Sequence, residues 1–302
     1  MKNINKFKLK RHIKISDRIY SLVIGFILII FVIITIYPIL NTVAISFNDA
    51  IDALRGGVYL WPRKFSLDNY STVLKKDSIT TGLYISVLRT VVAVVLQLST
   101  TALLAFVLSR KNFVFRKQLS FLYVMTMYVN GGLIPTFLLF KTLNLTNSFW
   151  VYVLPGMVSA FNMLVIRTYM NGLSDSLEES AMMDGAGYLT IFLKIIVPLC
   201  KPVFATVALF IAVGQWNSWF DTMLYNRMAE NLTTLQYELM KLLSSVSKLS
   251  GNANTAQFST ALVTTTSVRS AATVLTCLPI VALYPFLQRY FVTGLTIGGV
   301  KE

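Results

Sequence analysis

One polar segment between two long apolar runs brings four acids close together in the sequence. Its acids, small residues and glycine are Asp175, Glu178, Glu179, Ser180, Ala181, Asp184 and Gly185. Carboxylates can pair with Arg or Lys of a partner protein, and small side chains allow that partner to approach closely. The chemistry predicted here is therefore contact and force transmission rather than catalysis, although an ordinary amphipathic loop helix explains the same residues equally well.

Local signals predict a short helix over this segment. A capping box, formed either by Ser176 with Glu179 or by Asp175 with Glu178, indicates its start. We expect the helix to run to about residue 183 and to end at Gly185, because glycine readily takes the left-handed conformation that closes helices. A second helix is predicted to restart near residue 188 and to continue into the next apolar run.

A second set of candidates consists of aromatic and amide side chains inside or beside apolar runs. Such side chains offer flat apolar faces and hydrogen-bonding groups, so they are the candidate lining of a substrate path. The candidates are Tyr128, Asn130, Asn162, Gln215, Trp216, Asn217 and Trp219. For the two tryptophans a structural explanation competes, since tryptophan is enriched at membrane interfaces whether or not a ligand binds.

Catalytic and metal-binding motifs are missing from the sequence. It contains no GxxxxGK[ST] loop, no HExxH and no GxSxG. Its one histidine, His12, lies in a basic tail, and Cys200 and Cys277 show no metal-ligand spacing. We therefore expect no catalytic residue, no metal site and no cofactor in this chain.

Composition indicates an integral membrane protein. Of 302 residues, 55% are hydrophobic and only 13% charged, whereas soluble domains carry about 25% charged residues. Apolar stretches long enough to cross the membrane as helices recur along the chain. The net charge of +14 is explained by Lys and Arg at the ends of these stretches, so nucleic acid is not an expected partner.

The apolar runs predict an all-α membrane protein with about six transmembrane helices. The expected spans are roughly 19–45, 80–109, 118–140, 149–169, 195–220 and 267–287. In the third span the run Gly131–Pro135 weakens the helix, and Pro198 and Pro202 are expected to bend the fifth near its entry. Arg89 and Arg269, near span ends, are expected to snorkel to water or to form ion pairs.

Loop charges set the predicted orientation. Basic residues fill the N-terminal tail, 1–18, and the turn between the second and third spans, at Arg110, Lys111, Arg116 and Lys117. By the positive-inside rule both lie in the cytoplasm, and an even number of spans then places both termini there. The long connections outside are expected to be docking surfaces, and Leu235, Leu239 and Leu242 predict an amphipathic helix in the last of them.

The spacing of the acidic segment resembles the EAA loop of permeases from ATP-binding-cassette (ABC) importers. That pattern is EAA, three residues, G, nine residues, I, one residue, LP; here Glu179-Ser180-Ala181, Gly185, Ile195 and Val197-Pro198 match every spacing, with Ser and Val as conservative departures. "GGVYLWPRKFSLDNY", "VGQWNSWFDTMLY" and "LPIVALYPFLQRYFVTGLTIGGVKE" extend the resemblance over most of the chain. They resemble carbohydrate permeases related to MalG, closest to LplC and YtcP.

The resemblance implies a type I ABC importer permease fold with three regions. These are the tail 1–18, a permease domain over 19–290 with its coupling loop at about 171–198, and a cytoplasmic C-terminal tail, 291–302. Implied partners are a second permease, two cytoplasmic ATPases that bind ATP and Mg, an extracellular solute-binding lipoprotein and a carbohydrate. The residues implied to contact the ATPase are Glu178, Glu179, Ser180, Ala181, Asp184 and Gly185.

Other function classes remain as alternatives at this level. An ion-gradient-driven secondary transporter often carries acids at the membrane midplane, whereas every acid here falls in a tail, a loop or a segment end. An intramembrane enzyme would need paired acids or a nucleophile and base within the spans. An ABC importer permease for a solute other than sugar is a third alternative, because the sequence does not identify the substrate.

Overall fold

A computed structural model describes residues 15–53, 55–249, 266–282 and 284–285, and within this part the regular elements are helices. Their bounds are α1 Ile15–Ser46, α2 Ala50–Ala53, α3 Asp68–Leu74, α4 Asp77–Ser109, α5 Arg116–Tyr128, α6 Leu133–Thr142, η1 Phe149–Tyr152, η2 Leu154–Gly156, α7 Ala160–Met170, α8 Asp175–Met183, α9 Tyr188–Ile191, the π-helix η3 Phe192–Ile196, α10 Val197–Leu199, α11 Lys201–Asn217, α12 Phe220–Tyr225, η4 Glu230–Leu232 and α13 Leu235–Leu249. A last helix, Thr266–Ala282, follows. The predicted all-α class is confirmed for the described residues.

The centre of the bundle is α4, which packs against α7, α11 and α13. Small side chains on α4 make this packing close, since Ala93 and Ala105 are fully buried and Ala102 is nearly so. Close approach of helices through small residues is the usual packing device inside membranes, where lipid removes much of the hydrophobic drive for association. The long helix α4 therefore connects the two ends of the bundle.

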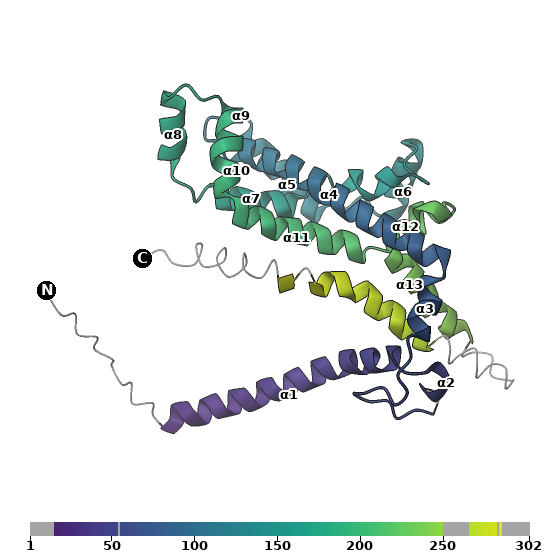
Figure 1. Cartoon of the computed structure of the whole chain (residues 1–302). Coiled ribbons are helices and arrows are strands. Elements are labelled where there is room, and N and C mark those ends of the chain that lie inside the picture. Colours follow the sequence, from purple (N-terminus) through teal and green to yellow (C-terminus); the bar gives the residue numbers. More distant parts are fainter. Residues whose placement is uncertain (1–14, 54, 250–265, 283, 286–302) are drawn as a thin grey trace.

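The first helix, α1, lies apart from this bundle (Figure 1). Its most apolar window is not buried at all within the chain. A helix that is apolar all round needs lipid or another protein as its surroundings. The helix begins at Ile15, inside the predicted tail 1–18, whereas residues 1–14 and the whole predicted C-terminal tail lie outside the described residues.

Three of the predicted spans are bent rather than continuous. Among the described residues, α1 and α4 are the two apolar helices that are uninterrupted and long enough to cross a membrane; three further spans result if each bent pair counts as one. The pair α5 and α6 turns by 116°, η1–η2 and α7 by 46°, and the helices either side of Cys200 by 81°. The break between α5 and α6 falls where the run Gly131–Pro135 was expected to weaken the third span, and Gly132 takes a positive φ of 86° there.

The bend at Cys200 confirms the effect expected of Pro198 and Pro202. Both prolines lack a backbone N–H, so the helical hydrogen-bond ladder is interrupted around this point. The preceding turn is the π-helix η3, and a new helix starts at Lys201. The segment from Tyr188 to Asn217 therefore forms an elbow between the polar end of the molecule and its core.

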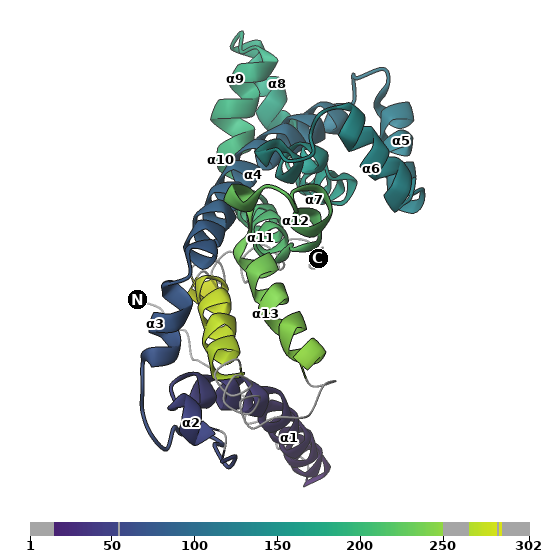
Figure 2. The same cartoon turned by 90° about the vertical axis from the view of Figure 1, so that its right-hand side faces the viewer.

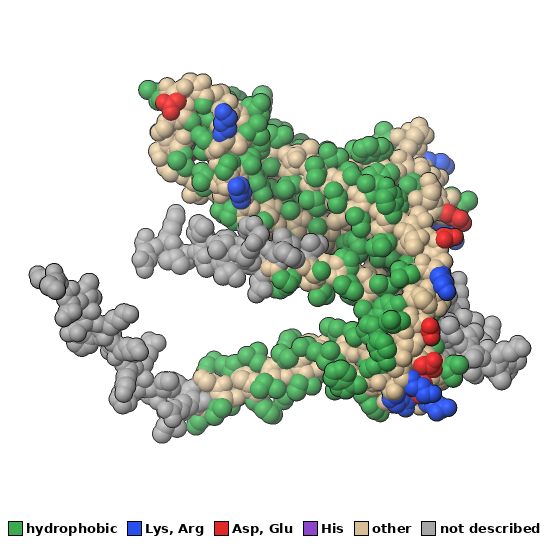
Figure 3. Space-filling view, viewed as in Figure 1, with side chains coloured by type: hydrophobic (Ala, Val, Ile, Leu, Met, Phe, Trp, Pro, Cys, Tyr) green, Lys and Arg blue, Asp and Glu red, His purple; other side chains and the backbone are tan. Residues whose placement is uncertain are grey.

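Charged side chains gather at the two ends of the molecule, and hydrophobic ones cover the middle (Figure 3). One end carries α8 and α9, and the opposite end carries α2, α3 and α13, as Figures 1 and 2 both show. The amphipathic helix predicted from Leu235, Leu239 and Leu242 is confirmed as α13. Such a distribution is expected of a protein that spans a membrane with polar ends on both sides.

Candidate coupling element and transport path

The helix α8 has the end that the sequence predicted and a different start. Its last turn closes through two hydrogen bonds, from the Gly185 N–H to the Met182 carbonyl (3.0 Å) and from the Ala186 N–H to the Ala181 carbonyl (2.9 Å). Gly185 takes a φ of 78°, so these bonds form the Schellman closure that glycine allows. The N-cap, however, is Ser174, whose side chain accepts a hydrogen bond from the Ser176 N–H. Both predicted capping boxes are therefore wrong.

Replacing Gly185 with alanine is expected to lower the free energy of unfolding by about 1 kcal/mol, because an L-residue in the left-handed region is strained. Gly187→Ala is the matched control, since its φ is −74° and a Cβ at either glycine would meet open space. Thermal unfolding of the two purified variants in the same detergent measures the difference. An equal loss in both would contradict this account of the helix end.

One face of α8 packs against the bundle. Ala181 is buried in the core cluster that also holds Ile191 and Phe192. Glu178 forms an ion pair with Arg110, the residue directly after α4, and each of these two side chains is only 15% exposed. Glu178 is thus engaged within the chain itself.

Two further contacts extend this link between α8 and α4. The guanidinium of Arg110 lies 4.6 Å from the centre of the Phe106 ring, which packs against the Phe192 ring at 5.1 Å. Lys111 pairs with Asp175 at the surface. The hydrogen bond and charge of Lys111 lower the pKa of the Asp175 carboxyl, so this carboxylate stays charged at neutral pH.

The opposite face of α8 is free for a partner. Glu179, Ser180 and Asp184 are exposed, and Met183 is 89% exposed. A flexible methionine beside carboxylates and a small residue suits a protein contact rather than a catalytic site. Adjacent acids in the sequence thus have opposite environments, with Glu178 turned inward and Glu179 turned outward.

At the other end of the bundle, Arg89 of α4 is buried and fully engaged. Its Nη2 lies 2.5 Å from Oδ2 of Asp221, and its Nε and Nη2 donate to Oε1 of Gln215 at 3.0 and 2.7 Å. The guanidinium stacks on the Tyr152 ring at 4.3 Å. With 1% of Arg89 exposed, snorkelling is wrong for this residue and the expected ion pair is confirmed; Arg269 is half-buried.

The predicted path residues fall into two groups. Gln215 and Trp216 are engaged inside the bundle: Nε2 of Gln215 donates to the Tyr152 carbonyl (3.1 Å), and Nε1 of Trp216 donates to the Thr276 carbonyl (2.9 Å). Asn162 is buried at the start of α7. The rest lie closer to the surface, with Tyr128 80% exposed, Asn130 and Asn217 exposed, and Trp219 half-buried.

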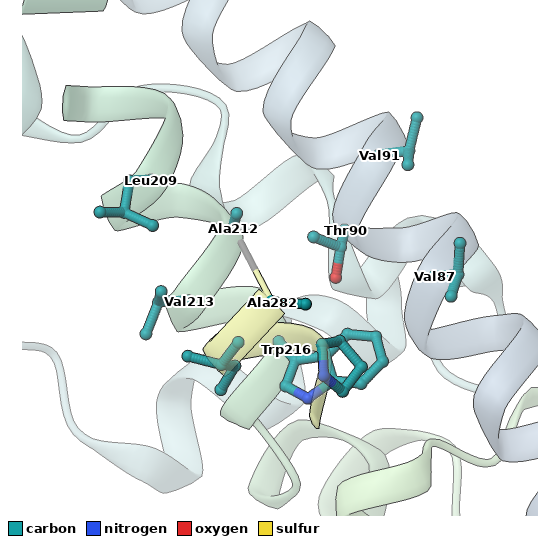
Figure 4. Close-up of a pocket in the computed structure, with 10 residues that line it drawn as sticks. Val87, Thr90, Val91, Leu209, Ala212, Val213, Trp216 and Ala282 are labelled. Atoms are coloured by element: carbon teal, nitrogen blue, oxygen red, sulfur yellow. The ribbon is translucent and has the colours of Figure 1, made fainter. Parts of the chain in front are cut away.

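A pocket of about 350 Å³ opens between α4, α11 and the last helix (Figure 4). Of the predicted path residues, Trp216 alone lines it. The other lining side chains are Val87, Thr90, Val91, Leu209, Ala212, Val213, Pro279, Ile280 and Ala282. A sugar needs hydrogen-bond partners that this lining does not offer, so the pocket is not a carbohydrate site.

Comparison with known proteins shows what this helical arrangement belongs to. Residues 97–297 match the family described as "Binding-protein-dependent transport system inner membrane component". The chain belongs to this family. The matched region contains α8, α11 and the last part of α4, from Gln97 onward, so it includes the candidate coupling element and the end of α4 that it contacts.

Individual relatives agree with this assignment along the whole chain. This chain is 34% identical to the polygalacturonan/rhamnogalacturonan transport system permease protein YtcP of Bacillus subtilis (strain 168), over 95% of this chain and 99% of the relative. It is 35% identical to protein LplC of the same organism, over 89% and 90%. It is also similar to a chain from the crystal structure of a bacterial ABC transporter that imports the acidic polysaccharide alginate, with a TM-score of 0.83, 32% identity and coverage of 91% and 98%.

Family membership decides between the function classes left open by the sequence. The chain is an inner membrane component of a transport system that depends on a binding protein, so the resemblance to importer permeases is confirmed. A self-sufficient secondary transporter and an intramembrane enzyme are both excluded. The resemblance did not reveal that Arg110 and Lys111 contact α8, or that Asp221 and Tyr152 surround Arg89, because these partners lie far apart in the chain.

Proposed function

We propose that this chain is the transmembrane permease subunit of an ABC importer for oligosaccharide or polysaccharide fragments. The observation that carries the proposal is α8, which packs on the bundle through Ala181 and leaves Glu179 and Met183 exposed. The proposed partners are a second permease, two cytoplasmic ATPases that bind ATP and Mg, and an extracellular solute-binding lipoprotein. The proposal also includes six spans, cytoplasmic termini, a permease domain over 19–290 and a coupling loop over about 171–198.

The contacts of α8 offer two routes for force to reach the core. One runs through the Glu178–Arg110 and Asp175–Lys111 ion pairs into the cytoplasmic end of α4. The other runs along the chain through α9 to α10 and the bend at Cys200 into α11. Because α4 and α11 pack extensively on each other, a displacement of α8 by an ATPase would move both core helices together.

Relatives support a carbohydrate as the substrate, since YtcP is named for polygalacturonan and rhamnogalacturonan and the solved transporter imports alginate. We place the path along the predicted residues Tyr128, Asn130, Asn162, Gln215, Trp216, Asn217 and Trp219. Within this set the exposed Asn130 and Asn217 are the better candidates for direct contact. Gln215 and Trp216 have internal hydrogen-bond partners, so they shape the path wall instead.

Reversing the charge of Glu179 tests the coupling assignment. Glu179→Arg is expected to weaken association with the ATPase roughly tenfold or more, equivalent to at least about 1.4 kcal/mol, because a cation then faces the cations of the partner. Glu230→Arg is the control, since Glu230 is an exposed acid on η4. Co-purification and sugar-stimulated ATP hydrolysis measure the effect. Unchanged values in Glu179→Arg would show that α8 is not the coupling element.

The whole assignment is tested by purifying the tagged chain from its native membrane in mild detergent and identifying the bound proteins by mass spectrometry. Recovery of a second permease and an ATPase is expected, and the ligand of an associated lipoprotein identifies the solute. Uronate oligosaccharides are the first ligands to test, given the relatives. A lipoprotein specific for a solute other than sugar would contradict the carbohydrate assignment while leaving the importer assignment intact.

A further inference from the structure

The segment after α2 folds back along the end of α1 instead of extending away from it. Nδ2 of Asn41 donates hydrogen bonds to the backbone carbonyls of Val58 (2.7 Å) and Tyr59 (2.9 Å). Asn41 lies five residues before the end of α1 at Ser46, which corresponds to about 7 Å along the helix axis. The tip of this loop is therefore level with the last turns of the helix, not beyond them (Figure 1).

A buried asparagine holds the base of the loop. Oδ1 of Asn48 accepts hydrogen bonds from the backbone N–H groups of Arg63 (2.8 Å) and Lys64 (3.0 Å), and Asn48 is fully buried. Asn48 and Phe65 also form an isolated β-bridge. Nε of Arg63 lies 3.1 Å from Oδ2 of Asp52. These contacts give the loop a defined shape, so its fold-back is a built feature.

The tip presents apolar and amphipathic side chains outward. Tyr59 is 64% exposed, Leu60 50% and Trp61 83%. On the preceding turn of α1, Tyr37 and Leu40 are also exposed. Large apolar side chains exposed in this number are unfavourable in water and indicate contact with a membrane or a protein.

The position along α1 favours the membrane. The apolar stretch Ile19–Ser46 contains 28 residues, about 42 Å of helix, whereas the hydrocarbon core is about 30 Å thick. The stretch must therefore extend into the polar interface at its ends, and Asn41 lies close to that boundary. Trp and Tyr are enriched at this depth, because their rings bury apolar surface while their polar atoms stay hydrated. Arg63 and Lys64, both exposed, follow where they can reach lipid phosphates.

We propose that the loop tip Tyr59–Trp61 inserts into the interface of the outer leaflet and sets the depth of α1 in the bilayer. The last turn of α1 also contacts α3, because the Ser46 hydroxyl bonds the Tyr70 hydroxyl (2.8 Å) and the Ser46 carbonyl accepts from Asn69 (3.0 Å). A lipid anchor beside this joint holds the outlying helix at a constant height while the bundle moves. The loop expected from sequence to be a docking surface is, in this proposal, a lipid contact.

Site-directed spin labelling tests the proposal in vesicles of phosphatidylglycerol and phosphatidylethanolamine. The background variant is Cys277→Ser, because Cys277 is exposed and Cys200 is buried. Labels are placed at Trp61→Cys and, as the control, at Lys75→Cys, an exposed site directly after α3. The collision rate of the label at position 61 with an aqueous nickel complex is expected to be about one third of the control's rate or lower, because polar solutes are excluded from the apolar boundary. Its collision rate with oxygen is expected to be higher than that of the control.

Equal nickel accessibility at the two positions would overturn the proposal. Protection of position 61 only after loaded solute-binding protein is added would also overturn it and would assign the tip to protein docking. If Trp61→Cys fails to fold, fluorescence quenching by brominated lipid replaces the spin label. The fluorescence of Trp61 is obtained as the difference between wild type and Trp61→Phe, and brominated lipid is expected to quench this difference. Absence of that quenching would contradict insertion. The experiment requires only that the chain is in a membrane, so its outcome is independent of the proposed substrate and ATPase.

Discussion

Replacing Asp221 with alanine is expected to destabilise the protein by about 3 kcal/mol, because it leaves the charge of the buried Arg89 uncompensated. Arg89 is 1% exposed and its pair with Asp221 spans 2.5 Å. Gln215 and the Tyr152 ring remain in contact with the guanidinium, but neither carries a compensating charge. Thermal unfolding of the purified variant in detergent measures the loss.

Two further variants serve as comparisons: one removes both charges at this site, and the other removes an exposed ion pair elsewhere. The double variant Arg89→Met/Asp221→Ala removes both charges and is expected to recover most of the lost stability, since a neutral buried pair has no unpaired ion. Lys111→Ala removes an ion pair whose partners are 73% and 63% exposed, and it is expected to change stability by less than about 1 kcal/mol. A double variant as unstable as Asp221→Ala would show that Arg89 acts through its shape rather than its charge.

Reversing Arg110 is expected to uncouple transport from ATP hydrolysis. In Arg110→Glu the new carboxylate faces Glu178 in a site where both side chains are largely buried, so the link between α8 and α4 becomes repulsive. Uptake and its stimulation of ATP hydrolysis are expected to fall about tenfold or more, a coupling loss of at least about 1.4 kcal/mol. Binding of the ATPase is retained, because the outward face with Glu179 is unchanged.

The exchanged pair Arg110→Glu/Glu178→Arg provides the decisive comparison. Attraction across the interface returns with the charges swapped, so uptake and stimulated hydrolysis are expected to recover at least in part. Glu178→Arg alone should resemble Arg110→Glu. Retained ATPase binding without recovery of uptake in the exchanged pair would show that the ion pair does not transmit displacement from α8 to α4.

These two sites give α4 a specific place in the proposed mechanism. At one end it contacts α8 through Arg110, and toward its other end Arg89 fixes it to α11 and α12 through Gln215 and Asp221. A helix held at both ends by charged contacts moves as a rigid unit, so a displacement at one end reaches the other. The proposal therefore predicts different defects at the two ends: lost coupling at Arg110 and lost stability at Asp221.

Local sequence signals determined the helical class of this protein and the places where its helices end or bend. Long apolar runs determined that it consists of membrane helices, since a chain in lipid must satisfy its own backbone hydrogen bonds. Glycine and proline determined where helices stop or bend, as at Gly132, Gly185 and Cys200 between its two prolines. The EAA-like spacing predicted the family, because the helix and the turn that it describes depend on residues near in sequence.

Tertiary structure alone decided which side chains are free to act. Glu178 and Glu179 are neighbours of the same type, and only the position of Arg110 makes the first internal and leaves the second exposed. Arg89 could have reached water from a straight isolated helix, but Asp221 comes close to it through the packing of α11 and α12. The sequence could not show these pairings, because burial and charge compensation depend on residues brought together from distant parts of the chain.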